Sequence, residues 1–252
     1  MLKLIKYEYR RNISGILVML GLILAAQGYF LWGVAKMSME HVTVAASLLM
    51  TLTGVAVSVV LLYSVSLYSK ELNAKTSYLT FMTPNSSAKI LGAKLLATLL
   101  LGLVYAALLG GCLVWDFTTM RRLFPEIQFV QAMLDALLIQ ANTNLSELLV
   151  VISSFAVDFL VNFYATVVIA YLAITISATA LQNKRFKGLL SLILFLGIMA
   201  AMIYLLNLLP GGYYSTMEEM MLNTLPGTLV SLAFAVAAFL LSARLLTKRV
   251  SL

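Results

Sequence analysis

The chain has 252 residues, of which 62% are hydrophobic and only 11% are charged. A soluble domain has about 45–50% apolar and about 25% charged residues and could not bury this excess, so the composition excludes a soluble globular enzyme and indicates an integral membrane protein. The spans that follow predict that this membrane protein is all-α. In a soluble protein the net charge of +7 would suggest a nucleic-acid partner. Here the basic residues gather in the predicted cytoplasmic loops of a membrane protein, so we expect no nucleic-acid partner.

The first twelve residues, MLKLIKYEYRRN, predict an amphipathic helix over residues 1–12. Apolar side chains follow helical spacing at Leu2, Ile5 and Tyr9. Basic side chains form a second stripe with the same spacing at Lys3, Lys6 and Arg10. Such a helix lies at the membrane interface, with its basic groups among anionic lipid phosphates. The alternative is a positively charged segment that only sets the orientation of the first span.

Six stretches are apolar over the roughly 20 residues that a membrane-crossing helix needs. They are Ile13–Ala35, Thr43–Tyr68, Ile90–Trp115, Leu149–Leu181, Leu189–Leu209 and Gly227–Leu246. The first is longer than the core of a cleavable signal peptide, about 7–15 residues, so we interpret it as a retained span. A weaker candidate, Phe129–Gln140, is short, contains Asp135 and is predicted to be an amphipathic surface segment.

The basic residues test this topology, because cytoplasmic loops carry an excess of Lys and Arg. With six spans and both termini in the cytoplasm, all of the 17 basic residues except Lys36, Arg121 and Arg122 fall inside. A seventh span at Phe129–Gln140 would move the basic cluster at Lys184–Lys187 outside and break the pattern. We therefore predict one transmembrane domain over residues 1–252, with six spans and cytoplasmic termini.

The first cytoplasmic loop, residues 69–89, is too polar to span a membrane and too patterned for a plain linker. Residues 70–82 contain no Gly or Pro and predict a short helix, which Pro84 would end. One of the next three residues would cap the following helix: Asn85, Ser86 or Ser87. This shape suits a rigid lever that projects into the cytoplasm, and the alternative is a solvated connector.

Two external regions are predicted, at residues 116–148 and 210–226. The first contains Phe129–Gln140, for which a gate on the outer surface and a helix lying on lipid remain open alternatives. The second has turn residues at both ends and resembles a small helical cap, flanked by the interface anchors Tyr213 and Tyr214.

Polar residues within the spans are candidates for a pathway. Asp158 is the only acidic residue placed inside a span, and Asn162 and Thr166 follow on the same helix face. A charge facing lipid is costly, so this face should look into the bundle or a wet cavity. It forms the polar wall of a pathway or a proton-linked site, unless Asp158 lies near the outer interface because the fourth stretch is overlong.

Small residues form stripes on the second and third spans. The first stripe is Ser47, Thr51, Gly54 and Ser58, and the second is Gly102, Ala106 and Gly110. Such stripes let helices approach closely, so we expect packing within the chain, with a dimer seam as the alternative. Thr51 and Ser58 are also candidate polar positions along a pathway.

Several chemistries are discounted. Cys112 and His41 are the only residues of their kinds, which excludes an intrachain disulfide and a His/Cys metal site supplied by one chain. No Gly-Lys pair occurs, so the phosphate-binding loop of P-loop ATPases is absent, and the HExxH and GxSxG motifs are absent as well. We therefore expect neither catalysis nor a cofactor on this chain alone.

The whole pattern resembles the membrane subunit of ABC-2-type transporters. The resemblance covers six spans, a basic N-terminal helix and, most tellingly, the loop after the second span. That loop reads Tyr68-Ser-Lys-Glu-Leu72, then Lys75-Thr-Ser-Tyr-Leu79, Thr83-Pro84 and Ala88-Lys-Ile-Leu-Gly-Ala-Lys94. Ser77 stands where the family often has Gly, and Asn85 stands where it often has an aliphatic residue.

This resemblance implies a bacterial or archaeal exporter. Two permease copies, identical or merely similar, would form a twelve-span pore, each docked on a separate cytoplasmic P-loop ATPase subunit that carries ATP and Mg. The coupling residues would be Lys70, Glu71, Leu72, Lys75, Tyr78, Leu79, Phe81 and Met82. The N-terminal helix would form an elbow through Lys3, Lys6, Tyr9 and Arg10. The apolar pathway favours an amphipathic peptide, a drug or a lipid-like substrate.

The runner-up hypothesis is an ATP-independent, proton-coupled carrier centred on Asp158. A third hypothesis is a membrane enzyme or an assembly factor. The pattern of residues 69–89 separates the first hypothesis from the other two.

Overall fold

The computed structural model describes residues 2–11, 13–73, 86–123, 145–180, 186–209 and 217–250. Within these ranges all regular structure is helical. The helices are α1 (Leu2–Arg11), α2 (Ile13–Ala35), α3 (Met39–Asn73), α5 (Ser87–Leu123), α7 (Leu145–Ala180), α8 (Lys187–Asn207) and α9 (Met217–Val250). Six of them are long and apolar enough to cross a membrane, which confirms the predicted number of such helices and fits a multi-pass membrane protein.

The helix ends differ from the predicted span ends, because a helix can continue beyond its apolar stretch wherever its residues favour helical backbone. The bounds of α2 agree with the first predicted span, whereas α3 continues to Asn73 and α5 to Leu123. The predicted external region 116–148 therefore begins inside α5. Its segment Phe129–Gln140 lies outside the described residues.

The predicted cap at 210–226 is also corrected. Residues 217–226 are the first turns of α9, which continues through Pro226 to Val250 without an intervening turn. Residues 210–216, with both predicted tyrosine anchors, lie outside the described part of the chain. The sequence predicts a turn at Pro226, but this proline removes only a single backbone donor, and membrane helices tolerate an internal proline.

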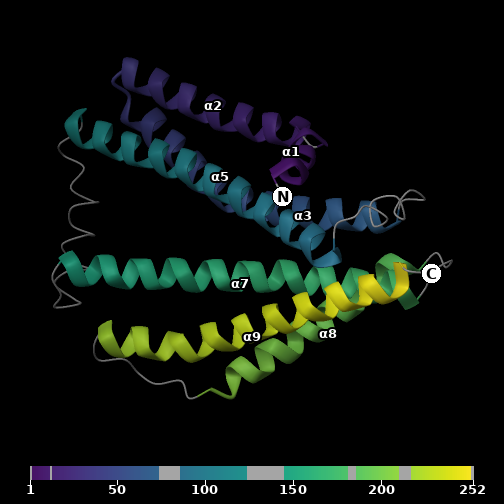
Figure 1. The fold of residues 1–252 in the computed structure, drawn as a ribbon. Coiled ribbons are helices and arrows are strands. Elements are labelled where there is room, and N and C mark those ends of the chain that lie inside the picture. Colours follow the sequence, from purple (N-terminus) through teal and green to yellow (C-terminus); the bar gives the residue numbers. More distant parts are fainter. Residues whose placement is uncertain are drawn as a thin grey trace. The chain divides into compact units, whose positions relative to one another are not determined.

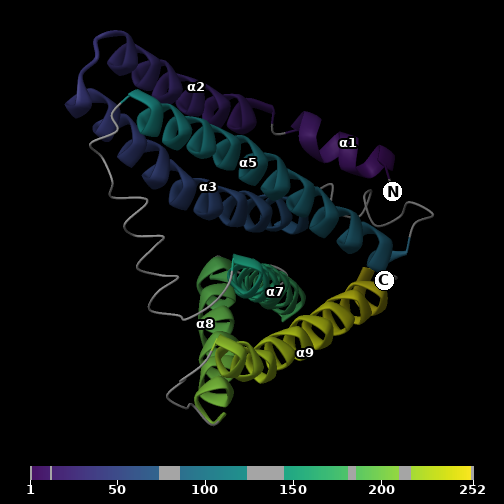
Figure 2. The same cartoon turned by 90° about the vertical axis from the view of Figure 1, so that its left-hand side faces the viewer.

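The chain forms two compact units, which we describe separately. Unit 1 comprises Met1–Tyr63 and Gly92–Asp135, and unit 2 comprises Ser64–Leu91 and Ala136–Leu252. In unit 1, α2, α3 and α5 run side by side (Figures 1 and 2). Phe30 of α2 is fully buried with Val42 and Ala45 of α3, and Met120 of α5 packs against them.

The turn between α2 and α3 is tight, and Gly33 makes it possible. The Ser38 amide donates to the Gly33 carbonyl at 3.1 Å, and Met37 takes a positive φ of 51°. A Cβ added at Gly33 would lie 3.0 Å from His41 Cβ and 3.1 Å from the Val42 amide nitrogen. A backbone nitrogen cannot move aside cheaply, so the close approach of the two helices requires glycine here.

Gly33→Ala should therefore lower the free energy of unfolding by about 1–3 kcal/mol, the usual cost of overpacking a close contact. Gly21→Ala on the same helix is the control, because no described atom lies within 4 Å of a Cβ at Gly21. Denaturant unfolding in mild detergent measures both variants. Equal stability of the two would show that the α2–α3 contact is looser than described.

In unit 2, α7 is the central helix. It packs against α8 and α9, and α8 also touches α9 (Figure 2). In its second half every residue from 167 to 175 is buried, and Thr166 is half-buried. By contrast α8 keeps most of its apolar side chains exposed, as expected of a helix surrounded by lipid.

Candidate functional site

The predicted coupling segment begins as the last turn of α3 rather than as a separate helix. Lys70, Glu71 and Leu72 all belong to α3, which ends at Asn73. Lys70 is exposed, but Glu71 is only 8% exposed. The start predicted for the coupling helix is thus wrong, because no helix-breaking residue separates it from the second span. Of these three residues Lys70 alone presents an exposed charge.

The other predicted coupling residues lie in a stretch, 74–85, outside the described residues. They are Lys75, Tyr78, Leu79, Phe81 and Met82. Beyond this stretch α5 begins with the predicted cap. The Lys89 amide donates to Ser86 Oγ at 3.4 Å, and the Ser86 carbonyl accepts from the amides of Lys89 and Ile90.

A pair of stacked tyrosines fixes the last turns of α3 in unit 2. The ring centroids of Tyr68 and Tyr171 of α7 are 4.2 Å apart, with an angle of 22° between the ring planes. Each phenol shares a hydrogen bond with a hydroxyl of the other helix: Tyr68 with Thr175 at 2.6 Å, and Tyr171 with Ser64 at 2.5 Å. All four residues are buried. This tyrosine clamp, Ser64, Tyr68, Tyr171 and Thr175, ties the end of α3 to α7.

The start of the loop and its end belong to the same compact unit. Residues 64–73 of α3 and 86–91 of α5 both fall in unit 2 with α7. On either side of the intervening loop the chain becomes buried, at Tyr68 in α3 and at Ile90 and Leu91 in α5.

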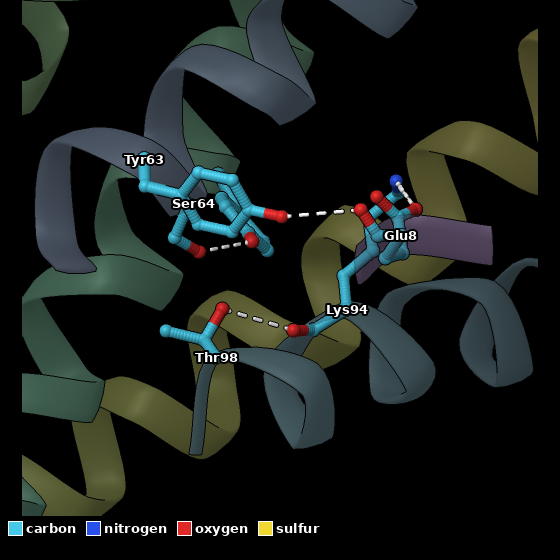
Figure 3. A network of polar contacts seen from close by, with 6 residues as sticks. Glu8, Tyr63, Ser64, Lys94 and Thr98 are labelled. Carbon is cyan, nitrogen blue, oxygen red and sulfur yellow. Dashed lines mark hydrogen bonds and ion pairs between the residues drawn. The ribbon is translucent and has the colours of Figure 1, made fainter. Parts of the chain in front are cut away.

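In unit 1, α1 docks on α5 through a buried ion pair. Lys94 Nζ of α5 donates to Glu8 Oε1 of α1, and the residues are only 4% and 7% exposed (Figure 3). The Glu8 carbonyl accepts from the Tyr63 hydroxyl at 3.3 Å, and Thr98 Oγ1 donates to the Lys94 carbonyl at 3.0 Å (Figure 3). These contacts join α1 to both α3 and α5.

The apolar face of α1 completes this contact. Ile5 is buried against Ala93 and Ala97, and the Tyr9 hydroxyl donates to the Ala97 carbonyl at 2.8 Å. Burial raises the pKa of Tyr9 above its usual value, so the phenol stays a neutral donor. Lys6 and Arg10 are exposed on the other face, and the side chain of Lys3 is outside the described ones. The amphipathic helix is confirmed, and its inward face rests on protein.

The predicted polar face of α7 meets partners on α9. Asp158 Oδ1 accepts hydrogen bonds from Asn162 Nδ2 at 3.0 Å and from Thr228 Oγ1 at 2.5 Å. Asn162 Oδ1 accepts from Ser231 Oγ at 2.7 Å, and Thr166 donates to the Asn162 carbonyl. This polar seam joins two helices of unit 2. Thr228 and Ser231 are single hydroxyls in an apolar stretch, and sequence reasoning missed them.

These hydrogen bonds favour a packing role for Asp158. Polar groups that bond across membrane helices stabilise them modestly, by about 0.6 kcal/mol on average and by up to about 2. Thr51 and Ser58, the other pathway candidates, are exposed, and each hydroxyl donates to a carbonyl of its own helix. Both residues belong to unit 1, whereas the polar seam belongs to unit 2.

Thr228→Val should remove one donor from the Asp158 carboxyl and lower the free energy of unfolding by about 1 kcal/mol, and by no more than about 2. Thr247→Val, later on α9, is the matched control, because Thr247 is exposed and donates to carbonyls of its own helix. It should change stability by less than about 0.5 kcal/mol. Denaturant titrations measure the free energy of unfolding of both variants. An equal loss of stability in both would argue that the Thr228–Asp158 hydrogen bond does not hold α9 on α7.

The small-residue stripes are not used for close packing within the described residues. No described atom lies within 4 Å of a Cβ built on Gly54, Gly102 or Gly110. The expected intrachain approach at these glycines is therefore not seen. Among the described residues, no group of three or more metal-ligating side chains is present.

Comparisons with protein-family models, curated proteins and solved structures find no match for the chain.

Proposed function

We propose that the chain is the permease subunit of an ATP-driven exporter of the ABC-2 type, in a bacterial or archaeal cell membrane. A separate P-loop ATPase subunit would bind ATP and Mg and dock on the loop between α3 and α5. A second permease, identical or similar, would complete the pore. The substrate class that we favour is amphipathic or hydrophobic: a peptide, a drug or a lipid-like molecule.

The observation that carries this proposal is the patterned loop of residues 69–89 between two anchored ends. On one side the tyrosine clamp holds α3 on α7. On the other side the Ser86 cap starts α5, whose first residues belong to the same unit. Such a loop would transmit a push from a partner protein to the spans, because the chain on both sides of it belongs to the same compact unit.

The docked helix α1 gives a second line of support. Its exposed basic residues Lys6 and Arg10 suit anionic lipid headgroups or an acidic partner surface. Its inward face is locked to α5 through Glu8 and Lys94. A movement of α1 at the membrane surface would thereby be transmitted to α5, the helix that follows the loop.

The carrier alternative gains no support from the polar seam. A carboxyl group within a span can mark a proton pathway or can be satisfied by neighbouring polar groups. In unit 2, Asp158 shares its hydrogen bonds with neighbouring side chains of α7 and α9, which account for its position.

Leu79→Asp should abolish binding of the ATPase and leave membrane insertion unchanged, because it places a charge in the predicted docking segment. Lys184→Glu in the second predicted cytoplasmic loop is the control and should retain binding. Binding is measured by co-purification in mild detergent. Retained binding in Leu79→Asp would refute the docking role.

Asp158→Asn separates the two hypotheses in the same assay. The permease proposal expects ATP-driven flux to persist in this variant. The carrier alternative expects flux and its pH dependence to be lost together.

A further inference from the structure

Unit 1 holds a buried carboxyl group that the proposed function does not use. Asp116 on α5 is only 1% exposed. Gln27 on α2 donates to it, from Nε2 to Asp116 Oδ1 at 2.7 Å. The two residues are 89 positions apart in the chain and link α2 to α5.

The other oxygen of each side chain has no hydrogen-bond partner among the described residues. These atoms are Asp116 Oδ2 and Gln27 Oε1, and both are buried. An ionised carboxylate and an amide oxygen are both acceptors, so they cannot satisfy one another. Buried polar atoms are nearly always paired, so two unpaired acceptors on one hydrogen-bonded pair call for an explanation.

The described titratable groups around this pair supply no counter-charge. Arg121 and Arg122, later on α5, are exposed, and Cys112 lies one turn before Asp116. At the α2–α3 turn, Lys36 Nζ lies 4.1 Å from the centre of the Trp32 ring, and His41 Nδ1 shares a hydrogen bond with the Tyr29 hydroxyl. An unpaired carboxylate in an apolar surrounding is strongly unfavourable.

We propose that Asp116 is a proton-binding site and is held as the neutral acid against Gln27. One proton on Oδ2 turns that atom into a donor toward Gln27 Oε1. The pair then makes two reciprocal hydrogen bonds, amide to acid and acid to amide, so a single proton satisfies both remaining atoms. The proton comes from water and returns to water when the acid ionises, and no other bond changes.

The contact between α2 and α5 then depends on that proton. Loss of the proton removes one of the two hydrogen bonds and leaves two acceptor oxygens facing each other. The ionised pair therefore favours separation of the two helices, or entry of water or a cation between them. This inference is independent of the ATPase and of Asp158.

The test is infrared spectroscopy of the purified chain in mild detergent at pH 7. A neutral carboxylic acid has a carbonyl stretch well separated from the carboxylate bands. We expect this band in the wild type, its loss in Asp116→Asn and its retention in Asp158→Asn. Asparagine can make the same two hydrogen bonds to Gln27 as the neutral acid, so we expect Asp116→Asn to fold.

Gln27→Leu provides a second and independent readout. It removes both hydrogen bonds but leaves the acid in place, so the carbonyl band should shift to higher frequency rather than disappear. A neutral-acid region that is identical in the wild type, Asp116→Asn and Gln27→Leu would overturn the proposal. So would loss of a carboxylate band, instead of the acid band, in Asp116→Asn.

Discussion

Replacing Lys94 by Met should lower the free energy of unfolding by about 3–5 kcal/mol, because it leaves the Glu8 carboxyl buried without its cation. Glu8 and Lys94 are 7% and 4% exposed, so water cannot replace the lost partner in the folded state. The orphaned carboxyl would have to be exposed or protonated, and either response weakens the hold of α1 on α5. Denaturant unfolding in mild detergent, followed by circular dichroism, measures the loss.

Two comparisons make this prediction specific. Lys89→Met removes an exposed lysine from the first turns of the same helix and should change stability by less than about 0.5 kcal/mol. The double variant Glu8→Leu with Lys94→Met removes both charges and should regain most of the stability, because an apolar pair can replace a buried ion pair. If Lys94→Met were no worse than Lys89→Met, α1 would not be docked as described.

Tyr68→Ala should lower the free energy of unfolding by about 3–5 kcal/mol, the usual cost of truncating a large buried aromatic side chain. Tyr68 is 1% exposed and stacks on Tyr171, so the deletion leaves a cavity at the base of the loop. Under the proposed function the variant should also retain ATPase binding, because the docking segment is unchanged. Its transport per ATP hydrolysed should fall, because the loop would no longer move α7.

Tyr68→Phe is the matched control for this clamp. It keeps the stacked ring and removes only the hydroxyl that bonds Thr175, whose own hydroxyl still donates to the Tyr171 carbonyl at 2.8 Å. The expected loss is about 1 kcal/mol, with coupling largely kept. Reconstituted vesicles give both readouts, as substrate flux and as phosphate release. Unchanged substrate flux per ATP hydrolysed in Tyr68→Ala would show that the tyrosine clamp does not transmit force.

Much of the fold could be predicted from the sequence, because its strongest signals are local. The apolar stretch Ile13–Ala35 gives α2 its bounds, the amphipathic spacing predicts α1, and the hydroxyl of Ser86 caps α5. The predicted helix ends are wrong where a helix continues beyond its apolar stretch. Helical hydrogen bonds form whether or not the side chains are apolar, so α5 continues to Leu123.

The contacts between distant residues could not be predicted in the same way. The ion pair of Glu8 and Lys94 joins residues 86 positions apart, and nothing in a single sequence indicates that they meet. Asp116 was assigned to an external region because it follows the apolar stretch, yet it is buried against Gln27. The shared face of Asp158, Asn162 and Thr166 follows from helical spacing and is confirmed.

The polar seam shows that the inward face of a helix can be predicted from the sequence, whereas the helix that it packs against cannot. Helical spacing placed Asp158 toward the bundle but did not identify α9 as its neighbour. Thr228 and Ser231 carry no pattern that distinguishes them from the other hydroxyl residues of the spans. Contact partners of this kind follow from tertiary packing, and only the structure reveals them.

The most direct test of the central claim is mild-detergent affinity purification of the chain from its native membrane, with mass spectrometry of the proteins that accompany it. The permease proposal predicts a P-loop ATPase in stoichiometric amount, together with a second copy of this chain or a similar permease. A chain that purifies alone, intact and repeatedly, would contradict the proposal. The loop of residues 69–89 would then be a connector.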